Sequence, residues 1–147
     1  MTKMSSLILM LVLMVPTVFA GCSSTEKNEE NEEIVTQSVV ASDFVLEVTT
    51  STNIVAGEAI KVNGTLKYTG IQPVEVSHGK PIIRFYFSGS NEERNYKDMA
   101  YLTEFKSGQL VEVEDEFIVT KKGKQNLLVN TDGDISLTMN PIEILVK

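Results

Sequence analysis

The fold is decided by the ten residues AIKVNGTLKY at 59–68, in which apolar and polar side chains alternate. The apolar face carries Ile60, Val62, Leu66 and Tyr68, and the polar face carries Lys61, Asn63, Thr65 and Lys67. A period of two predicts a half-buried strand of an antiparallel sheet, whose successive side chains point to opposite sides. Gly64 interrupts the apolar face, which indicates either a bulge or a closely approaching neighbouring strand.

Similar short segments recur along the chain and are separated by turn residues such as His78-Gly79-Lys80-Pro81 and Asp132-Gly133-Asp134. The expected strands lie at 43–50, 59–68, 73–77, 82–87, 109–120, 126–130 and 141–147. About seven short strands at this spacing predict an all-β fold, a single antiparallel β-sandwich over residues 42–147. The segment 90–105 lacks the alternation, and we expect a long loop with a short strand near Tyr101; a helical turn is the alternative.

Three stretches of this domain resemble the Ig-like and fibronectin-III-like modules of bacterial surface proteins: VAGEAIKVNGTLKYTG (55–70), EFIVTKKGKQNLLV (116–129) and IEILVK (142–147). The resemblance implies an Ig-like β-sandwich. The chain departs from antibody-type domains because it has one Cys and no Trp, and Gln125-Asn126 replaces the Tyr that often follows the late Gly turn. The stretch GTLKYTGIQPVEV (64–76) is also similar to Bacillus-type intracellular proteinase inhibitor domains. A shared fold does not by itself transfer a function.

The amino-terminal residues 1–21 have the pattern of a secretory signal. Lys3 precedes the apolar run LILMLVLMV at 7–15, and small residues follow before Cys22. The run is shorter than the roughly 20 residues that cross a bilayer. The last four residues of this stretch, Phe19-Ala20-Gly21-Cys22, resemble the lipobox of bacterial lipoproteins, although Phe19 replaces the usual Leu.

The lipobox resemblance implies a lipoprotein signal peptide at 1–21, which is removed, and a lipid on the sulfur of Cys22. Two or three acyl chains hold a protein stably on a membrane, so we expect a cell-membrane anchor on the extracytoplasmic face. Residues 22–41 then comprise the lipidated Cys22 and a flexible acidic linker. The sequence leaves open whether the host has one membrane or two.

The charge balance bears on the possible partners. The chain has 13 basic and 20 acidic residues and a net charge of −7, which disfavours a nucleic-acid partner because phosphate is repelled. Its single Cys excludes an intramolecular disulfide and a zinc site built from several thiolates. His78 is the only histidine and is more simply a turn or strand-end residue than a catalytic base or a ligand.

Two patterns could bind metal. Asn130, Asp132 and Asp134 match the start of a calcium loop, but Ile135 stands where the loop needs Gly, and Asp-Gly is an ordinary hairpin signal. A copper site could use His78 with Met99 and Met139, yet isolated methionines usually fill cores. We therefore predict a hairpin turn and neither a metal site nor a cofactor.

The sequence gives little support for a catalytic site or a sugar-binding site. The acidic run Glu112-Val113-Glu114-Asp115-Glu116 could include a carboxylate pair for glycoside cleavage, but a solvated strand face explains this largely alternating run more simply. Sugar-binding platforms would have to come from four tyrosines, Tyr68, Tyr86, Tyr96 and Tyr101, of which Tyr68 lies on the apolar face. We expect no enzymatic activity and no catalytic residues.

The sequence therefore predicts a membrane-anchored binding module whose partner is another envelope or extracellular protein. Loops carry binding on a rigid β scaffold, so we expect a binding surface built from loops at one end of the sandwich, such as 51–58, 77–81 and 88–100. The alternative is a regulator or inhibitor of secreted proteases that presents 88–100 as an exposed loop. The partner and the oligomeric state stay open at this stage.

Overall fold

The computed structural model describes residues 33–147, apart from the side chains of Lys97 and Asp98. The predicted signal peptide at 1–21, Cys22 and the linker as far as residue 32 lie outside the described residues. Within the described part of the chain, no helix is long and apolar enough to cross a membrane.

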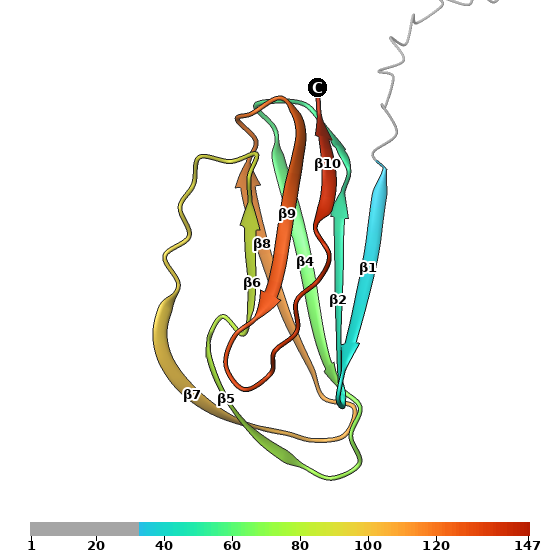
Figure 1. Ribbon diagram of the computed structural model, residues 1–147, viewed down its shortest axis with the longest axis vertical. Helices are drawn as coiled ribbons and strands as arrows, with labels where there is room; N and C mark the ends of the chain where they lie inside the picture. The colour runs from blue at the N-terminus through green and yellow to red at the C-terminus, as the bar shows by residue number, and fades with distance from the viewer. Residues whose placement is uncertain (1–32) are drawn as a thin grey trace, which may run out of the picture.

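In residues 33–147, ten strands form two four-stranded sheets and one two-stranded sheet (Figure 1). They are β1 (Ile34–Ala41), β2 (Phe44–Ser51), β3 (Asn53–Ile54), β4 (Ala59–Tyr68), β5 (Val74–Lys80), β6 (Ile83–Phe87), β7 (Lys97–Phe105), β8 (Leu110–Ile118), β9 (Gly123–Thr131) and β10 (Ile142–Val146). The strand orders are β1-β2-β4-β8, β3-β10-β9-β6 and β5-β7. All pairs are antiparallel except β3 with β10.

The predicted all-β antiparallel sandwich is confirmed, but the predicted number of about seven strands was too low. One extra strand is β3, which is only two residues long. A second is β1, whose residues were assigned to the linker at 22–41, so the sandwich begins at residue 34 rather than 42. The sequence IVTQSVVA at 34–41 alternates in burial and pairs with β2 along its whole length.

The segment expected to be mostly loop also contains a longer strand than predicted. Tyr101 does lie in a strand, as expected, but β7 extends over nine residues and pairs with β5 from Val74 to Lys80. The register of this pair shifts between His78 and Lys80. Because this irregular two-stranded sheet curves away from the sandwich (Figure 1), its residues lack the regular alternation that marks the other strands.

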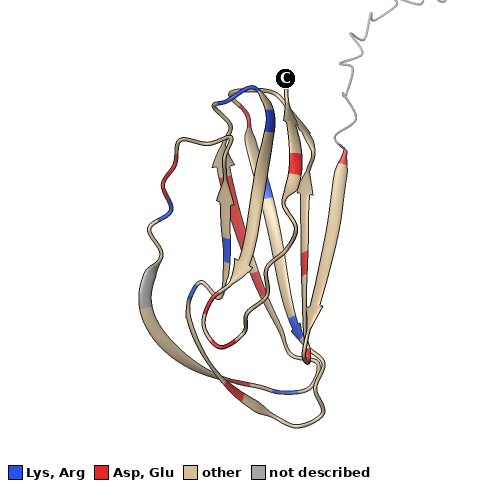
Figure 2. Ribbon diagram, in the orientation of Figure 1, with Lys and Arg blue, Asp and Glu red and all other residues tan. Residues whose placement is uncertain are grey.

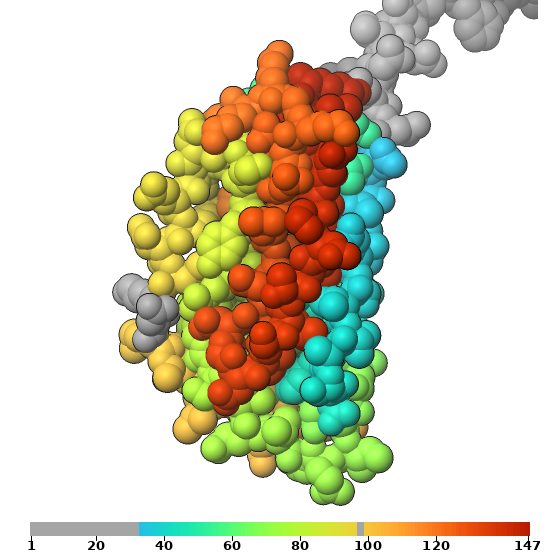
Figure 3. Space-filling model, viewed as in Figure 1, coloured from blue at the N-terminus to red at the C-terminus, as the bar shows by residue number. Residues whose placement is uncertain are grey.

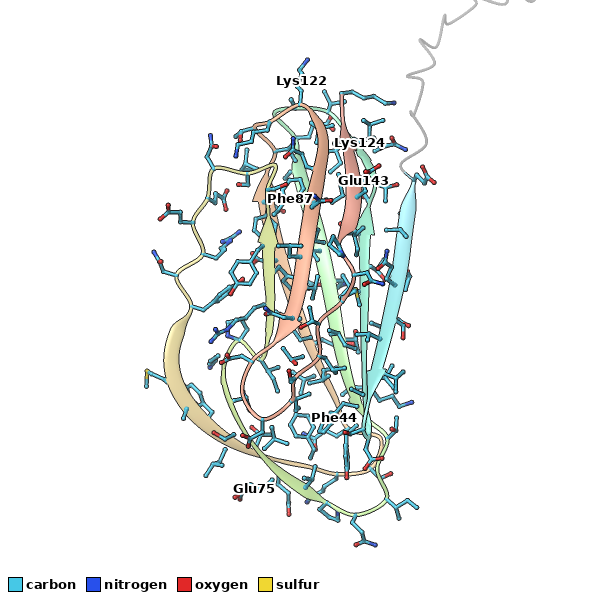
Figure 4. The ribbon with its side chains drawn as sticks, viewed as in Figure 1. Phe44, Glu75, Phe87, Lys122, Lys124 and Glu143 are labelled. Carbon is cyan, nitrogen blue, oxygen red and sulfur yellow. The ribbon has the colours of Figure 1, made fainter. Side chains whose placement is uncertain are left out.

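The core lies between the two four-stranded sheets and extends from Phe44 near one end to Phe87 near the other (Figure 4). The apolar face predicted for β4 is confirmed. Ile60, Val62, Leu66 and Tyr68 are all buried, and the polar residues between them are more exposed. Polar pairs occupy the outer faces instead, such as Lys124 and Glu143, whose charged groups are 2.9 Å apart (Figure 4).

Gly64 marks a close approach of the two sheets, the second of the alternatives that the sequence left open. The register of β4 with β2 and β8 runs through Gly64 without a bulge. A Cβ at this position would lie 2.7 Å from Cζ of Phe85 and 3.2 Å from two methyl carbons of Ile83, both on β6. The missing side chain therefore makes room for the Phe85 ring in the centre of the core.

We expect Gly64→Ala to destabilise the protein by about 1–3 kcal/mol, because the added methyl overpacks the contact with Phe85. Combining Gly64→Ala with Phe85→Leu should cost less than the sum of the two single changes, since the smaller side chain vacates part of the space. Urea unfolding measures both effects. The matched control is Thr65→Val on the outer face of the same strand, and a Gly64→Ala protein as stable as this control would contradict the account.

Candidate functional site

Residues 88–96 connect β6 to β7 and extend along the side of the sandwich where β6 and β8 are the outer strands (Figure 1). Tyr96 fastens this segment to β6. Its hydroxyl donates to the carbonyl oxygen of Phe85 at 2.8 Å and accepts the N–H of Phe85 at 3.1 Å. The phenol thus bonds the two backbone groups that a neighbouring strand would otherwise bond.

Arg94 fastens the same segment to β8. Its guanidinium donates to the carbonyl oxygen of Glu116, lies 3.0 Å from a carboxylate oxygen of Asp115, and is centred 4.5 Å from the middle of the Phe117 ring. Glu92 adds a bond from the N–H of Ile118 at 3.4 Å and an ion pair with Arg94 at 2.9 Å. The segment therefore bonds the middle of β6 and the carboxyl-terminal part of β8 on this side.

Beyond Tyr96, the chain borders a hollow of about 250 Å³, which we call the tyrosine hollow. It is lined by Lys80, Pro81, Asn95, Tyr96, Met99 and Tyr101. Met99 is 56% exposed and Tyr101 is 38% exposed. The Lys80 ammonium lies 5.8 Å from the centre of the Tyr101 ring, so the hollow combines aromatic, thioether and cationic groups.

A second hollow, of about 560 Å³, is lined partly by residues 92–95 of the same segment. Its floor includes Tyr86 and Leu128 from the outer face of the β3-β10-β9-β6 sheet. Tyr86 packs edge-on against Tyr96, with ring centres 5.5 Å apart, and Arg84 lies over the Tyr96 ring at 5.2 Å. Tyr96 therefore lines the tyrosine hollow and packs against Tyr86, which lines the second hollow.

Burial raises the pKa of Tyr96 above its usual value of 10.0, because the ionised phenolate would lose solvation. The hydrogen bond with the Phe85 backbone opposes this change, and the nearby Asp115 carboxylate reinforces it. The hydroxyl consequently stays protonated at neutral pH, and only in that form can it donate to the carbonyl oxygen.

His78 lies in β5 and not in a catalytic arrangement with other described residues. Its Nδ1 is 2.6 Å from the carbonyl oxygen of Gly79, and its Nε2 is 2.8 Å from the Thr103 hydroxyl. The ring also stacks on Tyr101, with centres 6.3 Å apart. Among residues 33–147, no group of three or more His, Cys, Asp or Glu side chains is placed to hold a metal ion.

The Asp-Gly turn at 132–134 closes onto β5. Asp132 pairs with Arg84 at 2.6 Å, and a carboxylate oxygen of Asp134 accepts the N–H of Ser77 at 2.8 Å. Gly133 has a positive φ of 92°, and a Cβ there would meet the Ser77 carbonyl. The returning chain bridges Asn130 through Thr138, so the predicted chain reversal is present. The carboxylates of Asp132 and Asp134 thus bond to Arg84 and to the backbone of Ser77.

The other candidate residues are dispersed. Glu112, Glu114 and Glu116 are exposed on the outer face of β8, as expected for a solvated strand face (Figure 2). Met139 is buried in the core, whereas Met99 is exposed on β7, so the two methionines are not in one site. Cys22 lies outside the described residues.

The three loops expected to form one surface lie at different ends of the molecule. Residues 51–58 and the start of 88–100 are close together, since Gly57 donates to the Val119 carbonyl at 2.9 Å and Thr120 donates to the Gly89 carbonyl at 2.8 Å. Residues 77–81 precede β6 and lie toward its opposite end, beside β7.

Comparison with known proteins does not assign a family. No family model matches the sequence, and no curated protein matches it. Among solved structures, the chain is similar to a β-glucosidase from Listeria innocua in complex with glucose, at 14% identity and a TM-score of 0.42, over 79% of this chain and 16% of that one. A β-glucosidase from Erythrobacter marinus gives 10% identity, a TM-score of 0.42 and the same coverage. Likeness at this level carries no argument about function.

We expect Tyr96→Phe to destabilise the protein by about 1–2 kcal/mol at neutral pH, because both backbone groups of Phe85 lose their bond to the phenol. The raised pKa of Tyr96 gives a stabilisation that is complete below pH 10 and is lost as the pH rises through the folded-state pKa. The difference between the native and Tyr96→Phe proteins should therefore narrow above pH 10.

Urea unfolding from pH 7 to 11.5 measures this difference. Tyr86→Phe is the matched control, because it removes a hydroxyl from the adjacent ring and keeps the two bonds of Tyr96. Equal stability of the Tyr96→Phe and Tyr86→Phe proteins at neutral pH would show that the Tyr96 bonds do not hold the segment.

Proposed function

We propose that the protein is a membrane-anchored bacterial lipoprotein whose β-sandwich binds another envelope or extracellular protein without performing chemistry. The observation that carries the anchor is Phe19-Ala20-Gly21-Cys22, in which the only cysteine of the chain directly follows a signal-like apolar segment. A sandwich that begins at residue 34 leaves a spacer short enough to keep the domain near the extracytoplasmic face of the membrane.

The tyrosine hollow is the binding surface that the side chains favour. Aromatic residues and methionine are enriched at protein interfaces, and here Met99 and Tyr101 are both substantially exposed next to Lys80. The neighbouring contacts of Tyr96 and Arg94 fix the walls of the hollow before any partner arrives. A preorganised surface loses less conformational entropy when it binds.

The second candidate is a regulator of secreted proteases that presents part of residues 88–100. It is favoured by the way in which Arg94 and Tyr96 hold the segment, while residues 91–93 and Asn95 remain exposed. A protease regulator of this kind needs a segment with a fixed shape that fits a cleft. The exposed part is acidic and amide-bearing, which favours a protease with a basic cleft rim.

We expect Cys22→Ala to release the protein from the membrane fraction, because the sulfur that would carry the lipid is gone. Mass spectrometry of the native amino-terminal peptide should show the added acyl mass on Cys22. Ser23→Ala is the matched control and should stay in the membrane. Equal membrane association of the Cys22→Ala protein would refute the lipid anchor.

We expect a photo-crosslinking amino acid at position 101, in the anchored protein in its own cells, to give a discrete adduct with one partner. The same probe at position 145 is the control, since Leu145 on β10 is exposed to a similar degree as Tyr101 and lies away from the hollow. Adducts equally strong at both positions would contradict the surface. A secreted protease recovered from position 101 would support the second candidate.

A further inference from the structure

Strand β1 is a long outer strand of the two four-stranded sheets, and residues 33–147 add no further strand to its outer edge. The outer strands of these sheets are β1, β8, β3 and β6. Residues 88–96 bond β6 at Phe85 and β8 at Glu116 and Ile118. The remaining part of β8 carries the exposed Glu112 and Glu114, whose charges disfavour strand pairing, and β3 is only two residues long. Within residues 33–147, β1 pairs with β2 alone, and it forms the right-hand margin of the molecule in Figures 1 and 3.

The hydrogen-bond pattern shows which backbone groups of β1 face outward. Thr52 N–H donates to the Glu33 carbonyl oxygen at 2.7 Å, and this pair continues the register in which Ile34 faces Ser51. In an antiparallel ladder, hydrogen-bonded and non-hydrogen-bonded pairs alternate. The odd-numbered residues of β1 therefore bond β2. The N–H and C=O groups that point away from β2 belong to the even-numbered residues Ile34, Thr36, Ser38 and Val40.

The edge of β1 lacks the features that normally prevent strand pairing. Its sequence IVTQSVVA contains no charged residue, no Pro and no Gly, and its pairing with β2 has no bulge. Ile34 is 65% exposed and Val40 is 63% exposed, although both are β-branched residues suited to a sheet. Such an edge is available to another strand.

We propose that β1 pairs in antiparallel fashion with β1 of a second copy of this chain, with Gln37 facing Gln37 across a two-fold axis. The strand is chemically symmetric about Gln37. In this register Thr36 meets Ser38, Val35 meets Val39, and Ile34 meets Val40. The inference stands independently of the lipid anchor.

The proposed register also matches the backbone. The numbers of any two facing residues sum to 74, so an even-numbered residue of one copy always faces an even-numbered residue of the other. The outward-pointing backbone groups of the two copies therefore meet. The four resulting pairs exchange about eight backbone hydrogen bonds, and the two four-stranded sheets become one of eight strands. A shift by two residues in either direction would set Gln37 against Val35 or Val39 and would place an amide beside an apolar side chain.

The charge distribution favours the same contact. Each copy has a net charge of −7, so two copies repel at most approaches. The acidic residues Glu112, Glu114 and Glu116 lie on β8, at the opposite edge of the sheet from β1 (Figure 2). Glu33, at the start of β1, is bound by the Asn53 side chain at 2.8 Å. Two copies can therefore meet along an uncharged strand.

The test is disulfide formation in the full-length chain in its own membrane. In a non-hydrogen-bonded antiparallel pair, opposite Cα atoms lie about 4.5 Å apart, which suits a disulfide. Under mild oxidation, Gln37→Cys should yield a reducible dimer at least about tenfold faster than Glu143→Cys, since pairing raises the effective thiol concentration. The unmodified chain is the control for any reaction of Cys22.

The register has its own test. Thr36→Cys alone should react poorly, because Thr36 meets Ser38 and not itself, whereas differently tagged Thr36→Cys and Ser38→Cys chains expressed together should form a mixed dimer. Equal rates for Gln37→Cys and Glu143→Cys, or no dimer, would overturn the pairing. A Thr36→Cys homodimer faster than the Gln37→Cys dimer would overturn the register, and a disulfide to a different protein would overturn the second copy as the occupant.

Discussion

The need to satisfy the backbone groups at the edges of the sheets governs this structure. A sandwich of two open sheets has four outer strands, each with N–H and C=O groups that lack a strand partner. Here β3 is short, and the single segment 88–96 bonds β6 at Phe85 and β8 at Glu116 and Ile118. Tyr96 bonds both backbone groups of Phe85, and Arg94 bonds the carbonyl of Glu116. Side chains thus do on this side what a further strand would do.

The same contacts create the candidate binding surface. Tyr96 can bond β6 only if residues 92–96 lie close against the sandwich, and in this position they line both hollows. Burial keeps the phenol protonated, which preserves its donor function, and the ion pair of Arg94 with Asp115 holds the segment against β8. The shape of the tyrosine hollow is therefore a consequence of how the sandwich protects its edges.

The sequence predicted those parts of the fold that depend on regular alternation, and it failed where long-range contacts decide. The faces of β4 and the chain reversal at 132–134 follow from local pattern and turn chemistry. The sequence does not separate β1 from the predicted linker, because the alternating residues of this strand directly follow an acidic stretch. The functions of Arg94 and Tyr96 depend on residues more than ten positions away, so no local spacing could have revealed the tyrosine hollow. Isolated aromatic and cationic residues in an otherwise polar loop were the only signal.

The position of β1 connects the edge to the proposed anchor. The strand comprises the last eight residues of the predicted linker at 22–41, so the part of the sandwich nearest to Cys22 in sequence is also an uncovered edge. In a two-fold pair the two ends at Glu33 lie about 26 Å apart, at opposite ends of an eight-residue ladder. Residues 22–33, as a coil, reach about 20 Å, so both copies can be anchored in one membrane with their strands parallel to it. Confinement to a membrane raises the local concentration of copies, and even a narrow edge-to-edge contact then becomes populated.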